Sequence, residues 1–170
     1  CLLSLFRDLV LDEILRRMHR RGDQAHIKRV LDYVAKTAPE FMLRTTLMVG
    51  FPGETEEHFA HMLRFIQEHP FDRVGAFTFS PEEGTGAEHL PDQVPEEIKQ
   101  ERLSRLMDRQ QSISRARNER RIGQRVEVLI EGFDGSRAFG RSYAEAPDVD
   151  GKIYLERTGA IPAGSYVQAR

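Results

Sequence analysis

The sequence predicts an α/β fold followed by a small antiparallel β-barrel. Up to Arg120, stretches with the helical spacing of apolar residues alternate with short runs rich in strand formers, which favours a parallel sheet with crossover helices. After Gly123, apolar residues occupy every second position and Gly and Asp mark close turns, which favours short antiparallel strands. We therefore divide the chain into an α/β part over 1–95, a long connecting helix within 96–122 and a β-barrel over 123–170 that is cut off in its last strand. The barrel strands are expected over 126–130, 137–143, 152–155 and 164–167.

The α/β part is predicted to contain helices and strands in alternation. Apolar residues place a first helix over Leu2–Met18, ending near Gly22, and a second helix around Ile27–Val34. A strand over 43–49, a helix over 56–68, a strand over 73–79 and the long helix over 96–120 follow. Two parallel strands leave unpaired edges and half a core, so this part is typical of the last section of a larger α/β barrel.

A glycine-rich turn with the sequence GFPGET, residues 50–55, joins the first of these strands to the next helix. A strand that leads into such a turn and a helix N-terminus presents free backbone N–H groups, where a small polar ligand can bind. Gly50 and Gly53 permit close approach of a ligand, and Glu54 supplies an acceptor. The spacing fits neither a P-loop nor a G-x-G-x-x-G fingerprint. An ordinary capped strand-to-helix turn is the competing interpretation.

Composition sets limits on the class of protein. Of the 170 residues, 39% are hydrophobic and 31% charged, which indicates compact domains rather than a disordered chain. A net charge of -2 argues against electrostatic binding of nucleic acid by the chain as a whole, although binding by a local basic patch stays possible. The single cysteine, Cys1, excludes a disulfide framework, and the histidines lack the spacing of metal ligands, so no metal site is predicted. We expect a cytoplasmic protein without a membrane span.

Four motifs, taken in order, resemble those of the radical-SAM methylthiotransferases. They are VGFPGETEEHF from Val49, DRVGAFTFSPEEGTGA from Asp72, LPDQVPEEIKQERLSRLMDRQQSIS from Leu90 and GRSYAEAPDVDG from Gly140. The resemblance covers about Asp12 to Arg170, and the last motif favours the branch that modifies ribosomal protein uS12. It implies the C-terminal part of a radical-SAM, TIM-like barrel, followed by a TRAM domain, an OB-like β-barrel, over Gly123–Arg170.

The resemblance also implies a reaction and its cofactors. The family uses S-adenosyl-L-methionine (SAM) and two 4Fe-4S clusters, and this branch adds a methylthio group to the β-carbon of an aspartate of uS12. The C-x3-C-x2-C loop that holds the radical-SAM cluster is absent, so we expect a C-terminal fragment that is inactive alone. Two alternatives stay open: a tRNA methylthiotransferase of the MiaB type, and a non-catalytic TRAM binding module.

By the same resemblance, residues at two neighbouring strand ends flank the adenine of SAM. The first strand end contributes Thr46, Met48, Val49, Gly50, Phe51, Pro52, Gly53 and Glu54, and the second contributes Phe79 and Ser80. In α/β barrels, ligands sit at the C-terminal ends of the strands, which agrees with this placement. The competing interpretation is that these residues only form strand core and turn.

Charged residues suggest two partner surfaces. An acidic cluster in the last motif is expected to contact the basic protein uS12; the proposed contact residues are Arg141, Glu145, Asp148 and Asp150. Turn formation by Asp and Gly explains the same residues equally well. Four cations near the end of the long helix are candidates for contact with ribosomal RNA: Arg115, Arg117, Arg120 and Arg121. Their competing role is to complement the helix C-terminus.

Overall fold

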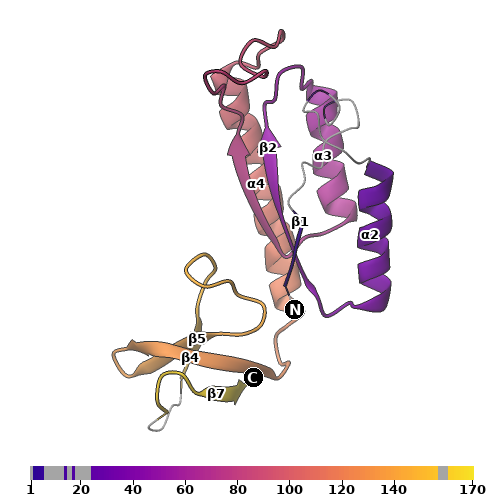
Figure 1. The fold of residues 1–170 in the computed structure, drawn as a ribbon. Coiled ribbons are helices and arrows are strands. Elements are labelled where there is room, and N and C mark those ends of the chain that lie inside the picture. Colours follow the sequence, from indigo (N-terminus) through magenta and orange to yellow (C-terminus); the bar gives the residue numbers. More distant parts are fainter. Residues whose placement is uncertain (1, 6–13, 15–16, 18–23, 157–160) are drawn as a thin grey trace. The chain divides into compact units, whose positions relative to one another are not determined.

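A computed structural model describes residues 2–5, 14, 17, 24–156 and 161–170. The chain forms two compact units (Figure 1). Residues Leu3–Arg117 make up the first, which we call the α/β unit, and Asn118–Arg170, with residues 1–2, make up the second, the β unit. No helix in the described part of the chain is both long and apolar enough to cross a membrane.

The α/β unit is a three-stranded sheet with helices. The strand order is β1-β2-β3, with bounds Leu2–Leu5, Met42–Val49 and Arg73–Thr78. The helices are α2 (Gln24–Thr37), α3 (Glu56–Glu68) and α4 (Glu96–Glu119). Strands β2 and β3 run parallel, and Met48 lies opposite Phe77 in their register.

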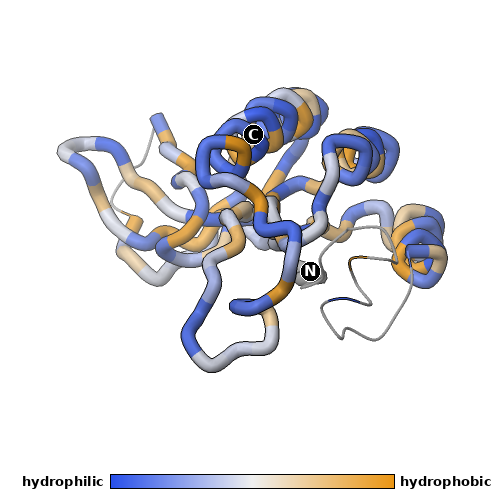
Figure 2. The backbone as a smooth tube through the Cα atoms, turned by 90° about the horizontal axis from the view of Figure 1, so that it is seen from above, coloured by the Kyte–Doolittle hydropathy of each residue, from blue (hydrophilic) through white to orange (hydrophobic). Residues whose placement is uncertain are grey.

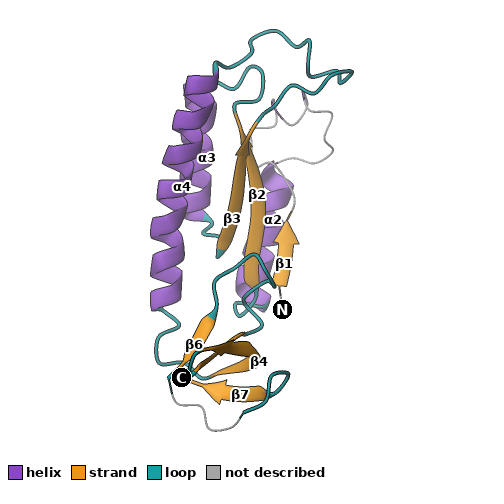
Figure 3. Ribbon diagram, turned by 90° about the vertical axis from the view of Figure 1, so that its left-hand side faces the viewer, coloured by secondary structure: helices purple, strands orange, loops and turns teal. Residues whose placement is uncertain are grey.

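The three helices pack on one face of the sheet (Figure 3). Alternate residues of β2 point to this face, and Leu47 and Val49 are fully buried there. Helices α2 and α3 are amphipathic and α4 is mostly polar, with hydrophobic and hydrophilic residues alternating along the backbone tube (Figure 2). They add to the core Ile27, Leu31, Phe59, Met62, Phe65, Ile66 and Leu106. Each buried side chain of this size contributes about 1.5–3 kcal/mol to folding, so this core holds the sheet and helices together.

The opposite face of the sheet is less covered in the described structure. On β2 it carries Thr46 and Met48, and on β3 it carries Gly75 and Phe77, which lie opposite them. The Phe77 side chain is 45% exposed. A sheet covered by helices on one face agrees with a section of a larger α/β barrel, which stays a prediction.

A buried polar network joins the start of β3 to α4. The Asp72 carboxylate accepts the Leu43 backbone N–H at 2.8 Å and pairs with the Arg117 guanidinium. The Gln110 amide donates to the Phe71 carbonyl at 3.0 Å, and the Ser114 hydroxyl donates to the Asp72 carbonyl at 3.1 Å. Side chains thus provide hydrogen bonds for three main-chain groups, the Leu43 N–H and the carbonyls of Phe71 and Asp72.

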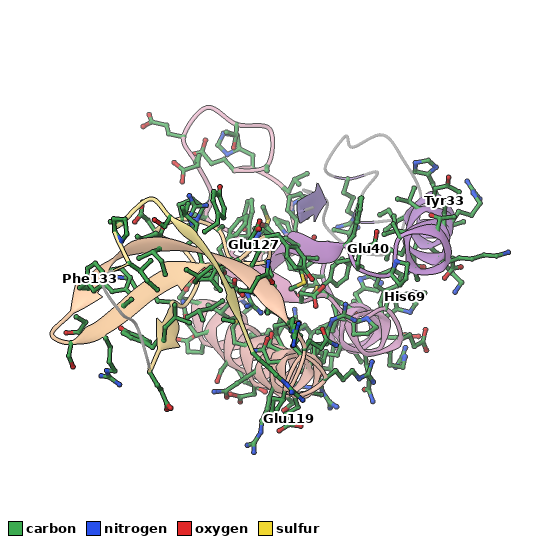
Figure 4. All side chains as sticks on the ribbon, turned by 90° about the horizontal axis from the view of Figure 1, so that it is seen from below. Tyr33, Glu40, His69, Glu119, Glu127 and Phe133 are labelled. Carbon is green, nitrogen blue, oxygen red and sulfur yellow. The ribbon has the colours of Figure 1, made fainter. Side chains whose placement is uncertain are left out.

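The β unit is an antiparallel sheet with strand order β6-β5-β4-β7. The bounds are β4 Val126–Asp134, β5 Arg137–Arg141, β6 Ile153–Leu155 and β7 Tyr166–Ala169. Val128, Ile130 and Ala138 form the buried centre of its core, and a bulge in β4 falls between Ile130 and Gly132. Figure 4 shows Phe133 near the end of β4, where its side chain is 48% exposed, and Tyr33 on α2 of the other unit, 68% exposed.

The predicted α/β unit followed by an antiparallel β unit is confirmed, but the first predicted element is wrong at its start. Residues Leu2–Leu5 form strand β1 and not the first turns of a helix over Leu2–Met18. Helical spacing in a short apolar stretch does not exclude a buried strand, because pairing with β2 decides the conformation. Ile14 and Arg17 are helical, and the rest of that predicted helix lies outside the described residues.

Candidate functional site

The candidate site lies where the parallel strands β2 and β3 end. The GFPGET turn follows β2, and Phe79 and Ser80 follow β3, so the two segments are neighbours (Figure 1). The Phe79 backbone N–H donates to the Val49 carbonyl at 2.8 Å, which carries the strand pairing one residue further. We call these two segments, residues 50–55 and 79–80, the ligand edge.

Aromatic side chains from both segments meet at the ligand edge. The Phe51 and Phe79 rings are 5.1 Å apart at 71°, an edge-to-face arrangement. Ile14 is buried against them, and Met48, Ala87 and Leu90 pack around this cluster. The structure therefore brings together three of the predicted cofactor residues, Met48, Phe51 and Phe79, around one apolar surface.

Glu54 lies inside the fold, beneath the turn. Its Oε1 accepts the Gly50 backbone N–H at 3.0 Å and pairs with Arg102 Nη1 at 2.8 Å. Arg102 also donates to the Glu54 carbonyl at 3.0 Å. The other carboxylate oxygen, Oε2, is buried without a hydrogen-bond partner in the described structure. Burial raises the pKa of Glu54, and the hydrogen bond from Gly50 and the charge of Arg102 only partly oppose it. Glu54 therefore holds the turn closed and is not presented to a ligand.

The turn uses most of its own N–H groups. Besides Gly50, the N–H of Gly53 donates to the Asp92 carbonyl at 2.9 Å and that of Glu54 donates to the Phe51 carbonyl at 2.9 Å. Among the described residues, the Phe51 N–H has no acceptor. Within residues 50–55, the predicted free N–H groups are thus reduced to one, because the Glu54 carboxylate and the carbonyls of Asp92 and Phe51 accept three of the others.

Both glycines of the turn are required by the backbone. Gly50 has φ 77° and Gly53 has φ 86°, in the left-handed region that side chains disfavour. A β-carbon on Gly50 would also overlap the Lys99 side chain. After the turn, the Thr55 side chain accepts the His58 N–H at 3.2 Å and caps α3. The capped-turn interpretation therefore holds for Thr55, whether or not the edge binds a ligand.

The other predicted cofactor residues lie in different places. Thr46 is on the sheet face that carries no helix, and Val49 is fully buried on the opposite face, in the core against the helices. Ser80 is exposed directly after Phe79, and Pro52 is buried with its carbonyl accepting Arg17 Nη1 at 3.3 Å. Val49 is therefore turned away from Met48, as alternation along a strand requires.

Two cations of α4 were not predicted to belong to this site. Lys99 is buried, and its Nζ donates to the Phe79 carbonyl at 2.9 Å and pairs with Glu96 at 3.4 Å. Arg102 is buried against Glu54. Charged residues on a long helix usually indicate a solvated face. A signal was present nonetheless, since Lys99, Arg102 and Leu106 continue one stripe at helical spacing.

In the β unit, the predicted partner residue Glu145 lies inside the fold. Ser142 donates to its carboxylate twice, through Oγ at 2.5 Å and through the backbone N–H at 2.9 Å, and Arg121 donates at 3.0 Å. Burial alone would raise the pKa of Glu145, but the Ser142 hydrogen bonds and Arg121 hold it below its ordinary value. Glu145 is therefore a structural anchor and not part of an exposed acidic surface.

Two of the remaining residues proposed as partner contacts, Arg141 and Asp150, make contacts within the β unit. Arg141 pairs with Glu131 at 2.6 Å, and Asp150 accepts the Ala146 backbone N–H at 2.8 Å. Asp148 is exposed and has φ 59°, a turn conformation. Local turn formation thus accounts for both aspartates, and contact with uS12 stays a proposal for their exposed atoms.

The four candidate RNA-binding arginines divide into two pairs. Arg117 is bound to Asp72, and Arg121 is bound to Glu145 and Ser142. Arg115, near the end of α4, and Arg120, directly after it, are exposed. The structural roles of Arg117 and Arg121 explain their presence without RNA.

Known proteins are similar in sequence to both units of the chain. Residues 122–170 match the family model described as the TRAM domain. The ribosomal protein uS12 methylthiotransferase RimO of Synechococcus sp. (strain JA-2-3B'a(2-13)) is 49% identical over 151 residues, 88% of this chain and 32% of that protein. RimO of Desulforudis audaxviator is 43% identical over 159 residues, 94% of this chain and 35% of that protein. RimO of Pectobacterium atrosepticum is 45% identical over 161 residues, 93% of this chain and 36% of that protein.

The chain thus spans about a third of the length of the relatives that it matches. The matches include the ligand edge, α4 and the β unit, because they cover 88% of the chain or more. Over the part of those proteins that it spans, the chain is homologous to proteins named RimO, and residues 122–170 match the TRAM domain.

Proposed function

We propose that this chain supplies a SAM-binding edge and the TRAM domain of an enzyme that adds a methylthio group to ribosomal protein uS12. The observation that carries this proposal is the 43–49% identity to proteins named for that reaction, which extends across both units. The proposed substrate atom is the β-carbon of an aspartate, where SCH3 replaces one hydrogen. The site of action would be the cytoplasm, where ribosomes are assembled.

The residues present fit the adenosyl part of SAM. An adenine ring needs apolar contact on its faces and a donor and an acceptor at its edge. The ligand edge contains the Phe51 and Phe79 rings, which are buried against each other and Ile14, the unpartnered Phe51 N–H and, next to it, the Gly50 carbonyl. The absence of side chains at Gly50 and Gly53 permits the left-handed backbone of the turn and leaves room for the side chains of Lys99 and Arg17. We assign binding and orientation of SAM to these residues, and no proton transfer to Glu54, which lies beneath the turn.

The residues present do not fit the two 4Fe-4S clusters. Each cluster needs three or four thiolates, and the sequence has one cysteine, Cys1, outside the described residues. In the described part of the chain, no group of three His, Cys, Asp or Glu side chains could hold a metal. Cluster ligands would have to come from residues outside this sequence, so we assign no cluster chemistry to this chain.

The proposal is tested with a protein that joins this chain to the other two thirds of the relatives' length. The protein is incubated anaerobically with SAM, a sulfide source, a reductant and uS12, and uS12 peptides are analysed by mass spectrometry. We expect one methylthio group on an aspartate, and none when the 170-residue chain is used alone. A tRNA anticodon stem-loop is the parallel substrate. Modification of the tRNA and not of uS12 would favour the MiaB-type alternative, and modification of neither would leave only a binding module.

A further inference from the structure

We infer that Lys99 and Arg102 of α4 are positioning residues for the ligand edge. Each would act on SAM indirectly, by fixing the main chain of one of the two segments that form the edge. This inference rests on the proposed function, because it takes SAM as the ligand. At Lys99 it differs from a general stabilising role in predicting an effect on ligand binding that is separable from folding.

Lys99 touches both segments with one side chain. Its Nζ donates to the Phe79 carbonyl at 2.9 Å and lies 5.7 Å from the centre of the Phe79 ring. Its aliphatic carbons occupy the space beside Gly50 that a β-carbon would need. The stem of Lys99 therefore packs on the β2 segment while its charged end binds the β3 segment, which fixes the spacing between them.

Packing alone does not explain a lysine here. The Lys99 side chain is 7% exposed, and burying an ammonium group is unfavourable unless its hydrogen bonds are well made. Its acidic partner Glu96 is itself 61% exposed, which weakens that ion pair through screening. A leucine or methionine would fill the same volume without the desolvation cost. The bond to the Phe79 carbonyl is thus the contact that an aliphatic side chain cannot supply at this position.

Arg102 performs the matching task on the other segment. It lies three residues after Lys99 and so on the same face of α4. Its Nη1 reaches both the carboxylate and the carbonyl of Glu54, at 2.8 and 3.0 Å. That carboxylate in turn holds the Gly50 N–H. Arg102 therefore fixes the turn through Glu54, without reaching the edge itself.

The two cations decide which main-chain groups stay open for a ligand. The carbonyls of Phe79 and Glu54 are used by α4, and the N–H of Gly50 is used by Glu54. The Phe51 N–H and the Gly50 carbonyl have no partner among the described residues. If Lys99 loses its charge, the Phe79 carbonyl is left without its donor and the segment can rotate, which would alter the spacing of the two rings.

The test uses the protein that joins this chain to the other two thirds of the relatives' length. Its affinity for SAM is measured by equilibrium dialysis. Lys99→Met keeps the aliphatic stem and removes the charge, and Lys99→Arg restores a donor. We expect Lys99→Met to weaken SAM binding roughly 10-fold to 100-fold, the loss typical of a buried charged hydrogen bond, and Lys99→Arg to recover part of it. Ser112→Ala, which removes an exposed contact on the same helix, is the control and should change nothing.

Amide hydrogen exchange on the 170-residue chain separates positioning from loss of fold. In Lys99→Met, the Phe79 N–H should exchange faster while amides in α2 and β4 keep their protection. Unchanged SAM affinity in Lys99→Met, with the parent binding SAM, would overturn the inference and leave the proposed function intact. Equal loss of protection in all of the α/β unit would also overturn it, since Lys99 would then serve general stability. If the parent itself does not bind SAM, the proposed function fails first.

Discussion

Two buried carboxylates, Glu54 in the α/β unit and Glu145 in the β unit, show how the same arrangement can produce opposite electrostatic results. Each closes a turn by accepting a backbone N–H, from Gly50 or from Ser142, and each pairs with one arginine. Yet the pKa of Glu54 is raised above its ordinary value and that of Glu145 is lowered.

Burial acts to raise the pKa of both carboxyls, and the Glu54 side chain is the more buried of the two; the donors on the two oxygens also differ. At Glu145, Oε1 receives Arg121 and Oε2 receives both the hydroxyl and the N–H of Ser142. At Glu54, Oε1 receives both donors, and Oε2 is buried with none in the described structure. A buried oxygen without a donor loses the solvation of its charge and regains nothing. Burial together with the number of donors on each oxygen, and not the number of ion pairs, therefore accounts for the direction of the pKa shift at each carboxyl.

The largest expected effect comes from removing the arginine partners. Arg102→Met leaves Glu54 buried beside no cation and should destabilise the α/β unit by about 3–5 kcal/mol. Arg121→Met should cost the β unit less, about 1–2 kcal/mol, because both Ser142 donors remain and the Arg121 side chain is 24% exposed. Urea unfolding followed by NMR signals of β2 and β4 reports the two units separately.

Arg109→Met provides the matched control for that pair. Arg109 lies on the same helix as Arg102, and its exposed side chain contacts the Gln67 amide oxygen at 3.3 Å. We expect a change within about 0.5 kcal/mol. Equal losses in Arg102→Met and Arg121→Met would mean that the number of remaining donors does not matter, contrary to the comparison of the two carboxylates.

A smaller effect is expected when each carboxylate becomes an amide. Glu54→Gln keeps an acceptor for Gly50 and Arg102 and removes the poorly solvated charge, and Arg102 retains the Glu56 carboxylate at 3.7 Å, so the stability of the α/β unit should change by less than about 1 kcal/mol. Glu145→Gln should cost the β unit about 1–3 kcal/mol, because one of the oxygens that now accept donors becomes an NH2 group. The same urea titrations measure both. If Glu54→Gln destabilised its unit more than Glu145→Gln destabilises the β unit, the expected order of the two effects would be contradicted.

The sequence predicted the elements after residue 24 because their apolar residues follow the local geometry of helices and strands. In α3, for example, Phe59, Met62 and Ile66 all face the core, as the helical spacing requires. The prediction for the start of the chain was wrong because it relied on the same local spacing. Residues Leu2–Leu5 fit a helical spacing, but they pair with β2 instead. Spacing describes one segment, whereas sheet pairing depends on another segment far along the chain.

The candidate site was predicted less completely than the fold. The turn glycines and the two strand-end phenylalanines could be placed from the motif alone. The roles of Arg102 and Lys99 could not, because their partners Glu54 and Phe79 are 48 and 20 residues away in the sequence. An acidic cluster in a loop likewise suggested exposure for Glu145, while Arg121, 24 residues earlier, holds it inside. The stripe of Lys99, Arg102 and Leu106 indicates which face of the helix is buried, but it does not identify the partners of the two cations.

The smallest expected effect is the dependence of the two units on pH, with opposite signs. The folded pKa of Glu54 lies above the ordinary value of 4.5, so its ionised form is disfavoured in the fold. Relative to Glu54→Gln, the α/β unit should gain stability as the pH falls from neutral through the folded pKa, and the gain is complete below 4.5. The folded pKa of Glu145 lies below 4.5, so its contribution is present above that value. Relative to Glu145→Gln, the β unit should lose stability as the pH falls below 4.5 through the folded pKa. Urea titrations of the parent and both variants across this range test the signs, and parallel pH profiles for the two units would refute the count of donors for each oxygen.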